Sequence, residues 1–214
     1  MRTKQLAVLG LAALVVLSGC SSLSGSLAFS AQKATVGQQA LSQTSYQEQG
    51  VRARNVTRTF SAAGQSKNVS VTNWIASYDQ QIDLGPLGKR RAAAFSVVST
   101  PQVSVLGQSV NPIGSYDNAK LVALLQQNYN GISDVTPVSN HTATMLGHPT
   151  NVTKFSGTAT LDGRSVNVYV DVTKVKDGGD YVLALAVYPQ RLSDRESKNV
   201  ETLLAGIQHA NASD

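Results

Sequence analysis

The sequence has a single cysteine, Cys20, among its 214 residues. One cysteine cannot form a disulfide within the chain, and it cannot build a metal site from several thiolates. If Cys20 is itself modified, the chain also has no free thiol nucleophile. The fold must therefore rest on packing and hydrogen bonding alone.

Charged side chains are also scarce, at 14% of the residues, against about 25% in a typical soluble domain. The formal net charge is +5, and loss of Arg2 and Lys4 with a predicted signal sequence would lower it to +3. A charge of this size is too small to mark a nucleic-acid-binding protein. The composition predicts a polar, mostly uncharged surface and no nucleic-acid partner.

The usual catalytic motifs are missing as well. No Gly-x-Ser-x-Gly, His-Glu-x-x-His or phosphate-binding glycine loop occurs. Residues Ser30–Lys33 have the Ser-x-x-Lys spacing of penicillin-binding enzymes, but no Lys-Thr-Gly or Ser-Asp-Asn partner follows, so we interpret them as a chance match. His141 and His148 flank a predicted turn and could form a weak metal site there, although exposed loop positions are the expectation. We predict no catalytic residues, no metal site and no cofactor.

The N-terminal residues form a different kind of pattern. Arg2 and Lys4 precede the apolar run Leu6–Leu17, which small residues follow. A helix needs roughly 20 apolar residues to cross a bilayer, and this run is shorter. The pattern predicts a secretory signal peptide over residues 1–19, removed after export.

The sequence Leu17-Ser18-Gly19-Cys20 resembles the lipobox of prokaryotic lipoproteins. The resemblance implies that Cys20 receives a lipid and becomes the first residue of the mature protein. Residues 20–26 are rich in Ser and Gly and are predicted to form a flexible tether after the lipid. The expected location is the outer face of the cell membrane, with the membrane as a partner through the lipid on Cys20.

Residues 27–210 are predicted to form one α+β domain, with amphipathic helices packed on a mainly antiparallel sheet. Helices are expected near Val36–Leu41, over residues 117–129 behind Asp117 as N-cap, and from Ser193 onward, where Ser193 and Glu196 have the spacing of a capping box.

The strands are predicted from alternation and from turn residues. Segments 51–60 and 69–78 predict a hairpin, and apolar residues that change from odd to even positions near Asn73 predict a bulge. Apolar residues after Lys89–Arg91 predict a buried strand that ends at Pro101. Asp-Gly turns beside the alternating valines of residues 166–172 predict an antiparallel meander toward the C-terminus.

Two long stretches carry a family resemblance. TNWIASYDQQIDLGPLGKRRAAAFSVVSTPQVSVLGQSVNPIG and VNVYVDVTKVKDGGDYVLALAVYPQRL resemble the matching segments of a family of haloarchaeal lipoproteins built on a domain of unknown function. The resemblance implies an exported, lipid-anchored protein and supplies no catalytic residues. Such proteins are usually strongly acidic, whereas this chain is mildly basic. More weakly, a meander followed by a terminal helix is similar to the fold of photosystem accessory proteins and of some mycobacterial lipoproteins.

Basic residues supply one candidate contact surface. Arg52, Arg54 and Arg58 share parity on one predicted strand, so their side chains point to one face, and the run Lys89, Arg90 and Arg91 could lie near them. Such a patch could contact anionic lipid headgroups. The alternative is a charged edge strand that prevents aggregation.

Two further groups of residues are candidate sites. Trp74, Tyr78, Tyr169 and Tyr188 could line a ligand groove, although aromatic residues in a sheet more often pack in its core. Candidate N-glycosylation sites occur at five Asn-x-Ser/Thr sequons, which begin at Asn55, Asn68, Asn140, Asn151 and Asn211.

The first functional hypothesis is a non-enzymatic binding or accessory module of the cell envelope, whose partner is an envelope protein or a small ligand. The alternative is an extracytoplasmic hydrolase with an unrecognised active site, for which Asp171, His141 and His148 are the candidate residues. A purely structural envelope role is a third hypothesis.

Overall fold

The structure is a computed structural model and describes residues 26–62, 65–83, 89–105, 108–109, 111–128, 131–161 and 164–210. The strands of the main sheet are β1 (Leu27–Ser30), β3 (Gln47–Ala62), β4 (Gln65–Asp83), β5 (Lys89–Pro101), β8 (Ile132–Met145), β9 (His148–Leu161), β10 (Arg164–Asp177) and β11 (Asp180–Pro189). Two short pairs are β2 (Ala34–Val36) with β12 (Ile207–His209), and β6 (Ser104–Val105) with β7 (Gln108–Ser109). The helices are α1 (Gln38–Thr44), α2 (Asn118–Asn128) and α3 (Ser193–Ala205), with 3-10 turns η2 (Pro112–Ser115) and η3 (Gln190–Leu192).

The predicted α+β class was wrong, because the protein is mostly β. Strands hold 66% of the described residues and helices 22%. The strands are longer than alternation of apolar residues predicts: the hairpin expected at 51–60 and 69–78 extends over Gln47–Ala62 and Gln65–Asp83. Polar Ser, Thr, Asn and Gln residues continue these ladders, and such residues give no periodic apolar signal.

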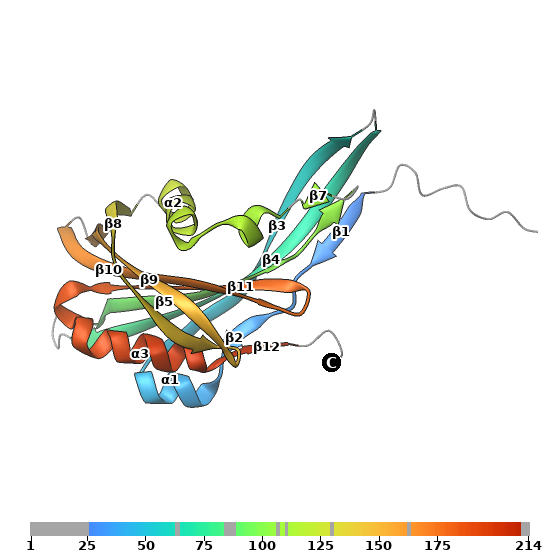
Figure 1. The fold of residues 1–214 in the computed structure, drawn as a ribbon. Helices are drawn as coiled ribbons and strands as arrows, with labels where there is room; N and C mark the ends of the chain where they lie inside the picture. Colours follow the sequence, from blue (N-terminus) through green and yellow to red (C-terminus); the bar gives the residue numbers. More distant parts are fainter. Residues whose placement is uncertain are drawn as a thin grey trace, which may run out of the picture.

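The main sheet has eight strands in the order β1-β4-β5-β11-β10-β9-β8, and β3 pairs with the other edge of β4 (Figure 1). Every pairing in it is antiparallel except that of β1 with β4. The sheet is therefore mixed. The predicted C-terminal meander is confirmed, since β9, β10 and β11 follow one another and β11 lies centrally between β10 and β5.

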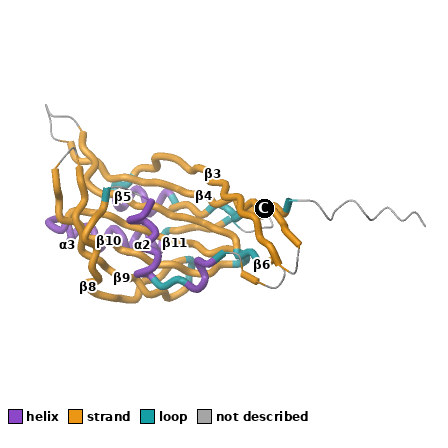
Figure 2. The backbone as a smooth tube through the Cα atoms, turned by 90° about the horizontal axis from the view of Figure 1, so that it is seen from above, coloured by secondary structure: helices purple, strands orange, loops and turns teal. Residues whose placement is uncertain are grey.

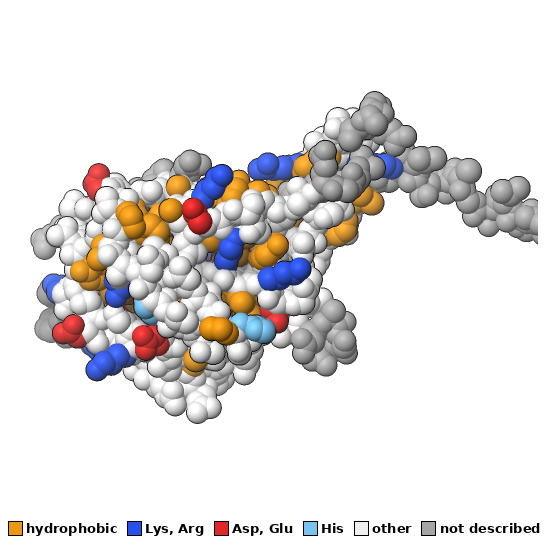
Figure 3. Space-filling model, viewed as in Figure 1, with side chains coloured by type: hydrophobic (Ala, Val, Ile, Leu, Met, Phe, Trp, Pro, Cys, Tyr) orange, Lys and Arg blue, Asp and Glu red, His pale blue; other side chains and the backbone are white. Residues whose placement is uncertain are grey.

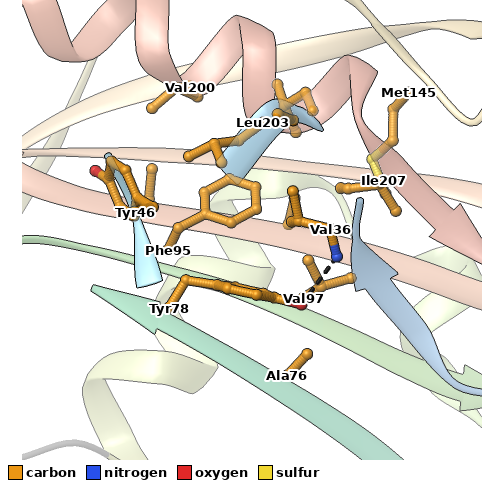
Figure 4. Close-up of a cluster of buried hydrophobic side chains, with 14 of the residues drawn as sticks. Val36, Tyr46, Ala76, Tyr78, Phe95, Val97, Met145, Val200, Leu203 and Ile207 are labelled. Atoms are coloured by element: carbon orange, nitrogen blue, oxygen red, sulfur yellow. Dashed lines mark hydrogen bonds between the residues drawn. The ribbon is translucent and has the colours of Figure 1, made fainter. Parts of the chain in front are cut away.

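Helices cover both faces of the sheet, but unequally. In Figure 1, α1 and α3 lie below the sheet and α2 lies above it. The larger core cluster lies between the sheet and the two helices α1 and α3. It includes Tyr78, Phe95, Val97, Val200 and Leu203 (Figure 4). In this cluster the hydroxyl of Tyr78 accepts a hydrogen bond of 2.8 Å from the Val36 backbone N–H, which ties β2 to the sheet (Figure 4).

The other face is packed by α2 only in part. Leu121 and Val122 of α2 pack on Phe155 and on the alternating valines of β10, of which Val168, Val170 and Val172 are buried. The Asp117 carboxylate accepts a hydrogen bond of 2.8 Å from the Lys120 N–H, which confirms its predicted capping of this helix. Seen from above, no described helix lies over β3 and β4 (Figure 2).

The hairpin of β3 and β4 projects beyond the rest of the sheet (Figure 1). The bulge predicted near Asn73 is not present: the β3–β4 pairing shifts between Glu48 and Gly50, and the β4–β5 pairing between Gln80 and Gln81. The phase of the apolar residues changes because β4 buries opposite faces along its length. Val69 packs in a small cluster with Val103 near the hairpin, whereas Tyr78 enters the main core.

The C-terminal helix begins as predicted but is not capped as predicted. Ser193 is the first helical residue, and Leu192 at the N-cap position makes no side-chain cap bond. Glu196 does not reach back to the helix start, because its carboxylate is buried and bonded to Tyr46, Arg195 and Asn199. The capping-box prediction was therefore wrong.

Candidate functional site

Three arginines line one face of β3. Arg52, Arg54 and Arg58 are exposed, and their register partners on β4 are Ile75, Asn73 and Val69. Residues paired in this way project from the same face of a sheet. The arginines therefore lie on the face of the sheet that α2 covers elsewhere, and within the described part of the chain none of the three forms an ion pair. We call these three residues the arginine face.

The second basic run does not join this face. Arg91 pairs in register with Gln81, whereas Arg52 pairs with Ile75, so the two lie about 20 Å apart along β4. The Arg91 guanidinium is 3.2 Å from the Asp79 carboxylate. Lys89 and Arg90 belong to β5, but their side chains lie outside the described set. The structure thus leaves the arginine face as the basic surface of the hairpin.

Space-filling views show hydrophobic side chains beside the basic ones along the hairpin and the sheet surface next to it (Figure 3). Leu27 and Val56 are each 37% exposed and lie on the face of the three arginines, since Leu27 pairs with Val69 and Val56 with Val71. Further along the same face, Ile75 and Val98 are half-buried and pack against none of the three buried clusters. With Ser77 and Ser96, which are also half-buried, they form what we call the open strip.

A buried polar network lies between α3 and the sheet. Glu196 is 0% exposed, and its Oε2 accepts hydrogen bonds from the Tyr46 hydroxyl at 3.0 Å and from the Asn199 amide at 3.2 Å. Arg195 donates from Nε to Oε1 at 2.9 Å and reaches Gln80 with Nη2. Burial, followed by the Glu196 charge, raises the pKa of Tyr46 well above its usual range. These contacts are satisfied among themselves, which is typical of a structural network.

A neighbouring group contains one of the predicted catalytic candidates. Asp171 is buried, and its Oδ2 accepts a hydrogen bond of 2.7 Å from the Tyr188 hydroxyl. Burial raises the pKa of Asp171, against opposing contributions from Tyr188, Lys154 and His141. Lys154 donates to Ser197 on α3 at 2.9 Å. The hollow that Asp171 lines has no room for a water molecule, and Asp171 Oδ1 is buried there without a hydrogen-bond partner among the described residues.

The other two candidates of the hydrolase hypothesis lie apart. His148 is exposed and pairs with Met145 at the β8–β9 turn, whereas His141 pairs with Val152. The turn that the two histidines flank is confirmed, but His141 lies four positions before Met145 on β8, about 13 Å along the strand. Across the described ranges, no group of three His, Cys, Asp or Glu side chains is placed to hold a metal ion. The structure thus does not bring His141, His148 and Asp171 into one site.

His209, which the sequence patterns did not single out, is the histidine that lies within hydrogen-bond distance of two carboxylates. Its Nδ1 is 2.7 Å from Asp177 Oδ2, and its Nε2 is 3.1 Å from Asp180 Oδ2. Ser99 Oγ lies 3.5 Å from the same Nε2. Together, Asp177, His209 and Ser99 have the residue types of a hydrolytic triad.

The geometry differs from a triad in two ways. Asp180 is nearer to Nε2 than Ser99 is, so this nitrogen faces a carboxylate and not a nucleophile. Ser99 is also 1% exposed and does not line the adjoining cavity of about 280 Å³, which is bordered by Asp177, Asp180 and His209. The imidazole between two carboxylates instead fastens β12 to the β10–β11 turn. The sequence signal that could have found it is the Asp-Gly-Gly-Asp turn of residues 177–180.

The aromatic candidates are core residues for the most part. Tyr78 and Tyr188 are each 1% exposed, and Tyr169 packs edge-on against Tyr188 with ring centroids 6.1 Å apart. Trp74 is half-buried, with the Lys33 ammonium 4.5 Å from its ring centroid. They form no shared groove.

Four of the five sequon asparagines lie on exposed strand positions, namely Asn55, Asn68, Asn140 and Asn151. Asn211 and Cys20 lie outside the described residues. Among the described helices, none combines the length and the apolar character that crossing a bilayer requires.

Comparisons with known proteins add a family. A solved structure with partial likeness is the solution structure of cyanobacterial PsbP (CyanoP) from Synechocystis sp. PCC 6803, at 8% identity and a TM-score of 0.40, over 91% of this chain and 99% of that chain. We carry no residue or function over from it. A search of the curated proteins found no match. The family model described as "Domain of unknown function (DUF6517)" matches residues 33–208, which contain the sheet from β3 to β11 and all three helices. The chain therefore belongs to the DUF6517 family.

Proposed function

We propose that this protein is a lipid-anchored, extracytoplasmic accessory module of the cell envelope that acts by binding and not by catalysis. The proposal includes the lipidation of Cys20, the outer face of the membrane as the location, and the haloarchaeal lipoprotein class that the sequence resembles. The observation that carries it is the organisation of the chain: the sheet begins at Leu27, seven residues after the cysteine of the lipobox-like sequence.

The polar side chains of the interior support binding over catalysis. Glu196, Asp171 and His209 each have buried partners that fix a helix or strand in place. A catalytic base needs a reacting group within hydrogen-bond reach, and the hollow beside Asp171 offers no space for one. Packing is the role that accounts for these contacts.

The open strip is the surface on which a protein partner would bind. Ile75 and Val98 present half-buried apolar surface on β4 and β5, and Arg52 borders it on β3. Burial of this partly exposed apolar surface by a partner would be favourable. A partner with an apolar patch and an acidic rim would fit it.

Cross-linking on intact membranes tests the proposal. We expect a tagged wild-type chain to recover one protein partner in constant ratio. Ser77→Lys places a charge in the middle of the open strip and should lower that recovery about tenfold or more, because an unpaired charge would be buried on binding. Ser139→Lys adds the same charge at an exposed position of β8 and should have no effect. Recovery of the chain alone, without protein partner, would contradict the accessory role.

A further inference from the structure

The end of the sheet that carries the arginine face is also the end at which the tether joins the domain. β1 runs parallel to β4, with Leu27 opposite Val69, and Val69 is also the register partner of Arg58 on β3. Leu27 and Arg58 therefore flank the same residue on its two sides. Two strand spacings separate their backbones, about 10 Å.

The tether is too short to hold this end far from a membrane. Six residues lie between Cys20 and Leu27, and the seven residue steps from one to the other span at most about 25 Å when extended. With a lipid on Cys20, the hairpin of β3 and β4 can thus reach the headgroup layer without stretching any described element.

The hairpin surface has the composition that such a layer favours. On the arginine face Val56 lies between Arg54 and Arg58, and Leu27 lies on the far side of Val69, which is itself buried against Val103. Val56 and Leu27 are each 37% exposed. Arginine side chains place an apolar stem along such a surface and extend the charged end toward phosphate. In the described part of the chain, Arg52, Arg54 and Arg58 have no carboxylate partner to compete for them.

We propose that the arginine face is a second membrane contact, which docks the β3–β4 hairpin on anionic lipid headgroups beside the anchored N-terminus. The inference rests on the proposed lipid anchor, and it names the partner of the hairpin as anionic lipid. Each basic residue near an anionic surface changes the binding equilibrium about fivefold, so the three together supply about a hundredfold.

A fluorescence-quenching experiment tests the contact on the full lipidated chain. Because Cys20 is the only cysteine and its thiol would carry the lipid, a single introduced cysteine is a unique labelling site. Ser61→Cys places a label near the tip of the hairpin, and Ser139→Cys places one on β8 as a reference. The lipidated chain is reconstituted in phosphatidylcholine vesicles with and without phosphatidylglycerol, each containing a headgroup nitroxide quencher.

We expect strong quenching at position 61, but not at 139, in phosphatidylglycerol vesicles at about 0.1 M salt. At about 1 M salt the quenching should fall to the level of pure phosphatidylcholine, because the screening length shortens from about 10 Å to about 3 Å. The triple variant R52Q/R54Q/R58Q should lower the docking equilibrium about a hundredfold. The variant K176Q/R191Q/K198Q removes the same charge from exposed positions of β10, η3 and α3 and should behave as wild type.

Equal quenching at position 61 in neutral and anionic vesicles, or no loss in the triple variant, would overturn the inference. If the label is quenched in no vesicle but the arginines govern cross-linking to an acidic protein in native membranes, lipid is the wrong partner. The wild-type dependence on lipid and salt keeps the test valid even if the triple variant folds poorly. The mass of the N-terminal peptide reports the lipid anchor separately, so an anchored chain whose hairpin stays unquenched overturns only this inference.

Discussion

Individual polar side chains beneath α3 contribute to stability through single, identifiable partners. Glu196 is the clearest case, because its carboxylate has no exposure and relies on Tyr46, Arg195 and Asn199. A buried charge is tolerated when its hydrogen bonds are satisfied, and removal of one partner leaves part of the desolvation cost uncompensated.

Tyr46→Phe should therefore lower the free energy of unfolding by about 1–3 kcal/mol, because it removes the hydroxyl that donates to Glu196 at 3.0 Å. Urea unfolding of the two proteins measures this difference. Tyr181→Phe is the matched control: this half-buried tyrosine stacks under the Lys174 ammonium, and its loss of a hydroxyl should cost less than about 0.5 kcal/mol. Equal losses in the two variants would contradict the role given to Glu196.

Asp171 predicts a dependence of stability on pH. Burial raises its pKa in the folded protein above the unfolded value of 3.8, so the folded state binds the proton more tightly. Its contribution is fully present below the unfolded pKa and is lost as the pH rises through the folded pKa.

Asp171→Asn keeps the side-chain volume and an oxygen that can accept from Tyr188, but it cannot ionise. Between about pH 3 and about pH 7, the stability of the variant relative to wild type should therefore increase. Urea unfolding at a series of pH values gives this difference. A constant difference over the range would show that the buried carboxyl does not titrate differently in the folded and unfolded states.

At this residue scale, the sequence could identify which residues are apolar and buried but not which polar residues join them. Val200, Leu203 and Leu204 follow helical spacing and are buried as predicted. Glu196 has the spacing of a capping residue, and nothing local reveals that Tyr46, on the strand side of the core, takes its carboxylate. His209 shows the same limit, because Asp177 and Asp180 approach it from a turn distant in sequence.

The two helices below the sheet, α1 and α3, pack closely where α3 ends. The junction of α1 with the end of α3 depends on Gly206, where an added Cβ would lie 2.3 Å from the Ala40 Cβ. The Gly37 N–H donates to the Gly206 carbonyl at 2.9 Å in the same junction. A methyl group here would push α1 away from α3.

Gly206→Ala should accordingly cost about 1–3 kcal/mol of unfolding free energy, through overpacking. Gly131→Ala is the control, because no atom lies within 4 Å of the Cβ that it adds and its backbone angle needs no glycine. Thermal unfolding of the two variants distinguishes them. If Gly131→Ala destabilises as much as Gly206→Ala, close helix packing is not the cause.

At the scale of elements, the hairpins could be predicted because turn residues and alternation are local signals. The helices α2 and α3, the β3–β4 hairpin and the β9–β10–β11 meander occur where the sequence predicts them, whereas the first helix begins at Gln38 and not at Val36, which belongs to β2. The strand lengths and the parallel pairing of β1 with β4 could not be predicted, because polar ladder residues and long-range pairing leave no periodic pattern. The α+β class failed for this reason.

In the molecule as a whole, the first strand of the sheet lies beside the β3–β4 hairpin. Leu27 begins β1 at the hairpin end of the sheet, so an anchor on Cys20 fixes which end of the domain faces the membrane. The open strip then lies further along the same face, where a membrane-bound partner could contact it. The proposed anchor, the arginine face and the open strip are therefore compatible with a single orientation of the domain on the membrane.

Charge at this scale predicts how the domain responds to salt. With the proposed signal peptide removed, the formal net charge would be +3, and three of the positive charges, Arg52, Arg54 and Arg58, lie on the β3–β4 hairpin. The Cys20→Ser variant cannot be lipidated, so the fraction of it that binds anionic vesicles should fall as the salt concentration increases. The lipidated wild-type chain should stay bound at every salt concentration. Vesicle flotation measures both. Salt-dependent loss of the wild-type chain would argue against a lipid anchor.

Mass spectrometry of the N-terminal peptide from membranes is the most direct test of the account. The account predicts a peptide that begins at Cys20 and carries the added mass of a lipid with more than one chain. An unmodified peptide that begins at Met1 would contradict it, because neither the anchor nor the orientation built on it would then exist.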